Sequence, residues 1–179
     1  KMLSPMDWSV FNEFFESLII VFTCRKGSID DSLRLNHYLN FAQQFKGYLD
    51  VDLEDWKIWS DQLLAYKDRL VLSVHNHGGP QITSFEINEC ISVQPAILKF
   101  AISVQESWQG LALLKKLRVT NIGASQLVLT CMGEAGQWSR MAAKALGSFW
   151  TYYCLPEGKT APGQIDIVQY QHEQFHEVP

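Results

Sequence analysis

Short apolar runs alternate along this chain with longer stretches of helical spacing, and this alternation constrains the fold more than any other feature. Six apolar runs are predicted as strands, at 18–24, 48–53, 69–74, 95–104, 126–131 and 149–154. Helical spacing is found at 7–17, 31–45, 56–66, 84–91, 105–117 and 137–146, and a last helix begins near Gln164. Strands separated by helices of about 10–15 residues predict right-handed βαβ units in a parallel sheet. Strands that are apolar almost throughout indicate a sheet covered on both faces.

Composition narrows the class of protein. At 179 residues the chain fits one domain with a substantial core, and its net charge of −4 provides no basic surface for nucleic acid. No apolar window reaches the length of about 18 residues that a membrane span needs, and residues 1–5 do not resemble a signal peptide. The four cysteines lack CxxC spacing. They are predicted to be reduced thiols, which favours a cytosolic or stromal compartment.

Several candidate functional residues lie at or near the ends of the predicted strands. They are Arg25, Asp50, Asp52, His75, Lys99, Met132 and the loop before Gln164. In parallel α/β folds the carboxyl ends of the strands carry the chemistry, in barrels and in doubly wound sheets alike. We therefore expect these side chains to form one site.

Lys99 lies inside the apolar run 95–104, where an ammonium group has no evident partner. Burial of a charged amine is costly and favours the neutral form, which is a nucleophile toward carbonyl groups. Lys99 is therefore a candidate Schiff-base lysine, and His75 is a candidate for proton transfer. The alternative is that the strand ends near Lys99 and that its ammonium reaches solvent.

Five features of the sequence occur in the order found in one enzyme family. Residues 132–140, Met-Gly-Glu-Ala-Gly-Gln-Trp-Ser-Arg, resemble the M-G-x-x-G-x-x-S-R segment of type I 3-dehydroquinate dehydratases. Residues 160–164, Thr-Ala-Pro-Gly-Gln, resemble their S-A-P-G-Q loop, and residues 73–76, Ser-Val-His-Asn, resemble their S-x-H-D/N segment. Residues 22–25, Phe-Thr-Cys-Arg, resemble their F-T-x-R strand end, and Lys99 falls where the family keeps its Schiff-base lysine.

The resemblance implies a (β/α)₈ TIM barrel that converts 3-dehydroquinate to 3-dehydroshikimate and water, without a metal or an organic cofactor. This reaction belongs to the shikimate pathway of aromatic amino acid biosynthesis. By resemblance, Lys99 forms an imine with the substrate ketone. His75 removes a proton from the adjacent carbon and returns it to the departing hydroxyl. Asp52 occupies the position of a glutamate that orients the histidine.

The resemblance also implies a set of substrate contacts. Arg140 holds the substrate carboxylate, for which a guanidinium fork is well shaped. Thr160 and Gln164 belong to a loop that closes over the substrate. Arg25 contributes polar contacts, and Met132 begins the M-G segment at the same site.

The sequence departs from the family pattern at several positions. Asp52 stands in place of glutamate, so its carboxylate is one methylene shorter and its contact with His75 is expected to need a water or a shift. Thr160 replaces serine, and Asn76 stands where aspartate is common. Six predicted strands against eight suggest one partial barrel domain over 1–179, in which the first two strands and an E-x-R substrate-binding motif are missing.

Two alternatives to a competent dehydratase follow from these departures. The chain could be a truncated, catalytically impaired relative, or the dehydratase part of a fusion with shikimate dehydrogenase. We expect 3-dehydroquinate as a small-molecule substrate, no nucleic-acid or membrane partner, and either a homodimer or the fused domain. The expected location is the cytoplasm, or the plastid stroma if the source is a plant.

A metal site at His75 and His77, with Cys131 or Cys154 as further ligands, is a rival interpretation. Histidines two positions apart need other ligands placed nearby. His77 is more simply a loop residue, so no metal is expected. His172 and His176 lie four positions apart on the last predicted helix, where surface placement is expected.

Overall fold

The computed structural model describes residues 18–27, 29–158, 163–168 and 170. Its internal contacts divide the chain into two compact units, residues 1–50 and residues 51–179. The helix predicted at 7–17 lies outside the described residues. No helix of the described residues is long and apolar enough to cross a membrane.

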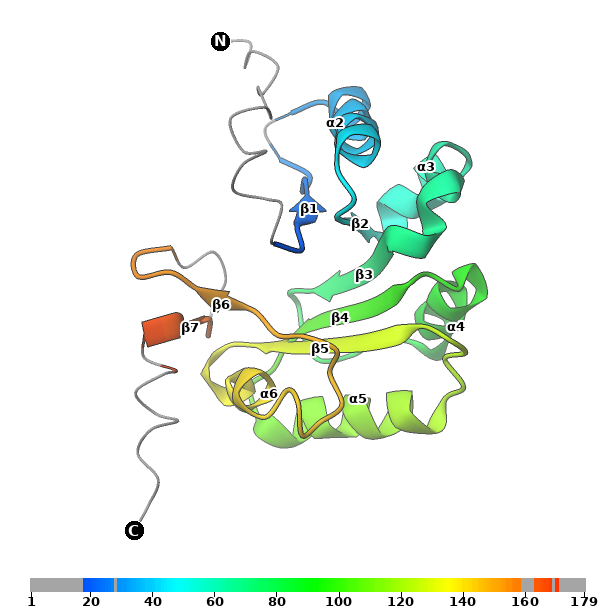
Figure 1. The fold of residues 1–179 in the computed structure, drawn as a ribbon. Helices are drawn as coiled ribbons and strands as arrows, with labels where there is room; N and C mark the ends of the chain where they lie inside the picture. Colours follow the sequence, from blue (N-terminus) through cyan, green and yellow to red (C-terminus); the bar gives the residue numbers. More distant parts are fainter. Residues whose placement is uncertain (1–17, 28, 159–162, 169, 171–179) are drawn as a thin grey trace. The chain divides into compact units, whose positions relative to one another are not determined.

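The first unit contains β1 (Val21–Thr23), α2 (Asp31–Gln44) and the start of β2 (Tyr48–Asp52), as Figure 1 shows. β1 and β2 pair in parallel, so this segment is a βαβ unit as predicted. α2 begins behind Asp30, whose side chain accepts a hydrogen bond from the Ser32 amide at 2.8 Å. Such a cap contributes about 1 kcal/mol to helix stability.

Aromatic packing joins α2 to β1 in this unit. The Phe22 ring on β1 stacks on Phe41 at 5.0 Å between centroids and meets Tyr38 edge-on at 5.1 Å. A Cβ at Gly47, just before β2, would overlap the Ile20 carbonyl oxygen. The close approach of the chain ahead of β1 therefore requires glycine at this turn.

The second unit begins at Val51, inside β2, and its strands follow the order β2-β3-β4-β5. Its strands are β3 (Leu70–Asn76), β4 (Ile97–Ser103) and β5 (Gln126–Met132). Its helices are α3 (Leu53–Leu63), which continues as the 3-10 helix η2 (Leu64–Arg69), then α4 (Ser84–Val93) and α5 (Ser107–Val119). β4 pairs in parallel with β3 and with β5, and a helix lies between each pair of consecutive strands.

The two faces of this sheet differ in chemistry. One face carries aligned apolar rows, of which Leu72, Leu98 and Leu127 form one. A Cβ at Gly110 of α5 would lie 2.5 Å from the Cys131 sulfur, so α5 covers this apolar face. α4 and α5 lie along the same side of β3, β4 and β5 (Figure 1). Side chains alternate along a strand, so the residues between these apolar positions project from the opposite face of the sheet.

Helix α4, which the sequence predicts over 84–91, begins behind the N-cap Thr83. The Thr83 hydroxyl accepts a hydrogen bond from the Glu86 amide at 3.1 Å, and the Glu86 carboxylate accepts one from the Thr83 amide at 2.8 Å. This reciprocal capping box satisfies amide groups that have no partner within the helix.

The chain after β5 differs from the sequence prediction. Instead of a helix over 137–146 there is a 3-10 turn, η3 (Glu134–Gly136), and a four-residue helix, α6 (Trp138–Met141). Residues 142–147 form turns that end at Gly147, whose φ of +69° favours glycine.

The sixth predicted strand is present only as β6 (Tyr153–Cys154). It pairs in parallel with β7 (Ile165–Asp166), in a separate two-stranded sheet. The sequence predicts a helix from about Gln164, but the strand β7 comes first and helical residues begin at Ile167. Within the described residues the main sheet has five strands and does not close, so the eight-stranded barrel of the expectation is not complete in this part of the chain.

Candidate active site

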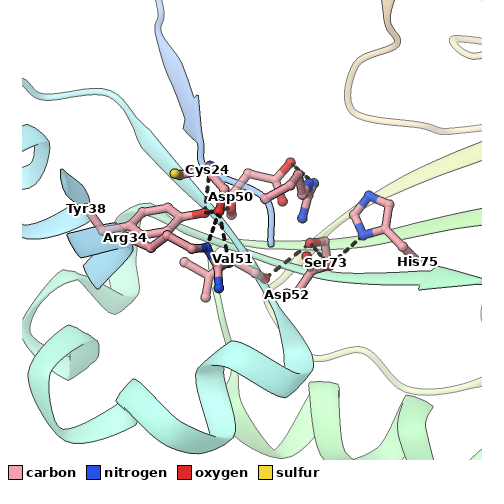
Figure 2. Close-up of polar contacts among 9 residues, drawn as sticks. Cys24, Arg34, Tyr38, Asp50, Val51, Asp52, Ser73 and His75 are labelled. Atoms are coloured by element: carbon pink, nitrogen blue, oxygen red, sulfur yellow. Dashed lines mark hydrogen bonds and ion pairs between the residues drawn. The ribbon is translucent and has the colours of Figure 1, made fainter. Parts of the chain in front are cut away.

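A carboxylate and an imidazole meet at the ends of β2 and β3. Asp52 is the last residue of β2, and its Oδ1 lies 2.6 Å from Nδ1 of His75 (Figure 2). A carboxylate accepts hydrogen bonds, so Nδ1 carries the proton in this contact and Nε2 is left to exchange one. The contact is direct, so of the two expectations for the shorter Asp52, a water or a shift, the water is not needed. Neighbouring parallel strands bring the two side chains close enough.

Ser73 adjoins the same carboxylate. Its hydroxyl oxygen lies 3.3 Å from Asp52 Oδ1 and 3.2 Å from the Val51 carbonyl oxygen, and its single proton can be donated to either. Ser73 is fully buried on β3, two positions before His75, so both side chains project from the same face of the sheet. The hydroxyl thereby helps to fix the carboxylate that orients the imidazole.

Lys99 lies in the middle of β4 and is 7% exposed. The strand therefore does not end at this residue, and the alternative of a solvated ammonium is not what the structure shows. In the parallel register Lys99 stands opposite Ser73 on β3 and Val128 on β5. Paired residues of parallel strands share a face, so Lys99 projects from the same face as Ser73 and His75.

Two further residues of this site escaped the sequence analysis. The Lys99 Nζ lies 4.8 Å from the centroid of the Tyr152 ring. Thr130 on β5 lies in the row of His75, and its buried hydroxyl has no hydrogen-bond partner among the described residues. Thr130 lies two positions before the predicted site residue Met132 on β5, so the alternation of side chains along the strand is a signal that could have identified it. No sequence signal distinguishes Tyr152 from the aromatic residues beside it.

Arg140 is held in the interior by the turn that follows β5. It is 2% exposed, and its Nη1 donates a hydrogen bond to the Cys131 carbonyl oxygen at 2.7 Å. Its buried Nε has no hydrogen-bond partner among the described residues. Burial lowers the pKa of Arg140, yet a guanidinium stays charged at neutral pH. A buried cation with a spare donor is suited to an anionic ligand.

Glycines shape the turn that carries Arg140. A Cβ at Gly136 would overlap the Cys131 carbonyl oxygen, so the chain can double back there only with glycine. Gly133 has a φ of +89°, and a Cβ at Gly163 would overlap the Gly133 carbonyl oxygen. The glycine of the Pro-Gly-Gln sequence therefore packs directly against the glycine of the Met-Gly sequence.

Within the first unit, Arg25 follows β1 and pairs with Asp50. Arg25 Nη2 lies 3.0 Å from Asp50 Oδ2, with the arginine side chain 35% exposed and the carboxylate buried. Buried side chains hold the segment before Arg25 in place: Arg34 donates two hydrogen bonds to the Cys24 carbonyl oxygen, and the Tyr38 hydroxyl accepts one from the Cys24 amide at 3.0 Å. Sequence analysis named Arg25 and Asp50 but not their pairing.

Two of the remaining predicted contacts, Met132 and Gln164, lie within the described residues, at the end of β5 and directly before β7. Met132 ends β5 and is buried. Gln164 is half-buried, and its Nε2 donates to the Tyr153 carbonyl oxygen at 3.4 Å. Thr160 lies outside the described residues, as do His172 and His176.

The surroundings of His75 and His77 bear on the alternative interpretation of a metal site. His77 stacks beside His75 with ring centroids 6.2 Å apart, while His75 Nδ1 is engaged by Asp52. The described residues contain no group of three or more His, Cys, Asp or Glu side chains that could hold a metal ion. All four cysteines are free thiols, as predicted.

Comparison with known proteins places this arrangement in a family. The family model for type I 3-dehydroquinase matches residues 8–172. A 3-dehydroquinate dehydratase of Streptococcus suis is 30% identical over 159 residues, which cover 85% of this chain and 70% of that relative. A 3-dehydroquinate dehydratase of Syntrophobacter fumaroxidans is 32% identical over 131 residues, which cover 68% of this chain and 55% of that relative.

Solved structures show the same fold. The type I 3-dehydroquinate dehydratase of Clostridium difficile superposes with a TM-score of 0.75 at 16% identity, covering 92% of this chain and 70% of that one. The 3-dehydroquinate dehydratase of Geobacillus kaustophilus gives a TM-score of 0.71 at 20% identity, covering 89% and 69%. The sequence match over nearly the whole chain and the shared fold agree. The chain belongs to the type I 3-dehydroquinase family.

Proposed function

We propose that this chain is a Schiff-base-forming lyase that converts 3-dehydroquinate to 3-dehydroshikimate and water. Family membership supplies the reaction class. The observation that carries the proposal is the placement of buried Lys99 on the same face of the sheet as the Asp52–His75 pair. A nucleophilic amine and an oriented imidazole on one face are the two groups that such an elimination needs.

In the first step the neutral Lys99 amine attacks the ketone carbon of the substrate. The carbinolamine that results takes up a proton from solvent, loses its hydroxyl as water and becomes an iminium ion that links Nζ to the substrate. The positive nitrogen withdraws electrons from the adjacent carbon, so a proton on that carbon becomes acidic. The enzyme thereby creates its own electron sink.

In the second step His75 removes that proton through Nε2, and the electron pair forms an enamine. The enamine then expels the hydroxyl on the next carbon, which takes the proton from His75 and departs as water. Hydrolysis of the conjugated iminium consumes one water, releases the product and restores the Lys99 amine. The net reaction is the loss of one water from the substrate.

The substrate carboxylate is assigned to Arg140. Its unused Nε donor and its buried charge support this role. Arg25, Met132, Gln164 and Thr160 are proposed as further substrate contacts on the strength of the family motifs. Asp52, supported by the Ser73 hydroxyl, is proposed to keep the His75 ring in the tautomer and orientation that proton transfer requires.

The wider context of the reaction is also a proposal. The family match runs continuously over 8–172, which supports a single partial barrel domain. The shikimate pathway is the metabolic setting, and the four free thiols favour a reducing compartment such as the cytoplasm or a plastid stroma. A homodimer or a fused shikimate dehydrogenase domain is retained as the expected assembly.

A direct assay tests the proposal. The purified chain is incubated with 3-dehydroquinate, and the conjugated enone of the product is followed by its absorbance. We expect product from the wild-type chain and from Lys115→Met, a control at an exposed lysine of α5, and none from Lys99→Met. A folded wild-type chain that binds the substrate but forms no product would instead favour the catalytically impaired relative.

A further inference from the structure

The amine of Lys99 lies beneath an aromatic ring that no motif singled out. Nζ is 4.8 Å from the centroid of the Tyr152 ring, within the distance at which a cation is attracted to the face of an aromatic ring. Tyr152 lies in the segment between β5 and β6, far from Lys99 in the sequence. The tertiary fold alone brings the ring to the reacting nitrogen.

The Tyr152 ring is itself supported by a second aromatic residue. Trp150 lies with its ring centroid 6.4 Å from that of Tyr152 and with the two ring planes at 89°, an edge-to-face arrangement. Tyr152 is half-buried. A ring held in this way needs little rearrangement when charge develops beside it.

The proposed reaction places a positive charge on the Lys99 nitrogen, next to this ring. The attacking amine of Lys99 is neutral, whereas the iminium nitrogen carries a positive charge through the proton abstraction. The negative face of an aromatic ring attracts the cation more strongly than the neutral amine. Only an interaction that strengthens along the reaction path accelerates it.

We infer that Tyr152 is a further catalytic residue, whose ring face stabilises the iminium cation formed on Lys99. This inference rests on the proposed function and adds to it a residue and a physical effect. The iminium cation is the covalent intermediate itself, so its stabilisation by the ring should speed the formation of the adduct and lengthen its lifetime. The phenol hydroxyl is not required, and the ring alone carries the role.

The chain contains a matched control in the same unit. Arg69 lies 5.4 Å from the centroid of the Tyr66 ring, another cation over an aromatic face, in the 3-10 helix η2. Neither residue belongs to the proposed site. Changes at Tyr66 report what the loss or weakening of a cation–π contact does to this protein when catalysis is not involved.

The test replaces Tyr152 by phenylalanine and by phenylalanines with one, two and three ring fluorines. Fluorination weakens the negative face of the ring progressively while nearly preserving its size. The rate of adduct formation is measured by quenching mixtures of enzyme and 3-dehydroquinate with borohydride at set times and weighing the Lys99 peptide. We expect Tyr152→Phe to retain the wild-type rate and the fluorinated series to lose rate stepwise, by about 2- to 30-fold in total.

The same series at Tyr66 should leave the rate unchanged. A flat rate across the fluorinated series at Tyr152, with adduct still formed on Lys99, would overturn the inference and leave the proposed function intact. Absence of any adduct in the wild-type chain would instead overturn the proposed function. Tyr152→Leu removes the ring completely. If this variant fails to fold, the fluorinated series still tests the role of the ring.

Discussion

Oδ1 of Asp52 lies 2.6 Å from Nδ1 of His75, at the ends of two neighbouring parallel strands. The shorter aspartate therefore reaches the imidazole directly. Ser73, 3.3 Å from the same oxygen, limits where the carboxylate can lie. The pair is the structural basis for assigning His75 as the proton-transfer group.

Replacing Asp52 by asparagine should lower kcat more than it changes KM. The amide can present its NH₂ to Nδ1 and favour the wrong tautomer, and a hydrogen bond to a charged group is worth about 1.5–3 kcal/mol. We expect a fall in kcat of about 10- to 150-fold, measured in the dehydration assay. Asp61→Asn on the exposed side of α3 is the control. Normal turnover by Asp52→Asn would show that the carboxylate does not position His75.

His75→Ala should abolish measurable turnover while Lys99 still forms the imine. General acid–base groups contribute about 10²- to 10⁴-fold, whereas attack on the ketone uses the amine's own nucleophilicity. Product formation and borohydride-trapped adduct are measured in parallel. His77→Ala is the matched control, because the His77 ring stacks beside the His75 ring while the Asp52 carboxylate contacts His75. Loss of activity in His77→Ala alone would mean that the two histidines have been assigned in the wrong order.

Arg140→Met should weaken binding of the substrate carboxylate and lower kcat/KM by about 10- to 150-fold, since a charge-assisted contact of about 1.5–3 kcal/mol is lost. A ketone analogue without the carboxylate separates this effect from a loss of stability. It should react equally with the variant and with the wild-type chain. Arg118→Met, on the exposed side of α5, controls for loss of a surface cation. An equal deficit toward both substrates would assign Arg140 a purely structural role.

Alkaline pH should destabilise the fold through two buried thiols. Burial raises the pKa of Cys90 to about 12 and that of Cys131 to about 11, from an ordinary thiol value of 9.0. Above about pH 9 the unfolded chain loses protons that the folded chain keeps, so the free energy of unfolding falls as pH rises toward 11 and 12. Below pH 9 these thiols contribute no pH dependence.

Denaturant melts of the wild-type chain and Cys90→Ala between pH 8 and about pH 11 check this sign. The variant is less stable at pH 8 because it loses buried volume, but its stability should fall less steeply above pH 9. Parallel pH profiles for the two chains would show that the Cys90 thiol is not linked to folding.

The periodic parts of the sequence predicted the fold well. Strands that pack on both faces are apolar throughout, so the runs at 69–74, 95–104 and 126–131 appear as β3, β4 and β5 within a few residues of the predicted bounds. The segment 137–146 has helical spacing but folds as a short helix and turns. There the glycines and the buried Arg140 hold the chain in a tight turn. This turn depends on tertiary packing, so the periodicity of the sequence does not predict it.

The candidate site was predictable as residue types and not as contacts. Lys99 and His75 were identified because a charge in an apolar strand and a histidine at a strand end are local signals. The Ser73 contact with Asp52 depends on strand register, and the ring of Tyr152 over Lys99 depends on how a distant segment returns to the sheet. Neither relation has a signature within a window of sequence.

Covalent trapping shows whether Lys99 forms the proposed Schiff base with the substrate. The wild-type chain is mixed with 3-dehydroquinate, reduced with borohydride, digested and analysed by mass spectrometry. We expect the reduced ligand's mass on the peptide that contains Lys99, and we expect it to be lost in Lys99→Met. Labelling confined to Lys115 or Lys116, or equal labelling of the wild-type chain and Lys99→Met, would contradict this expectation.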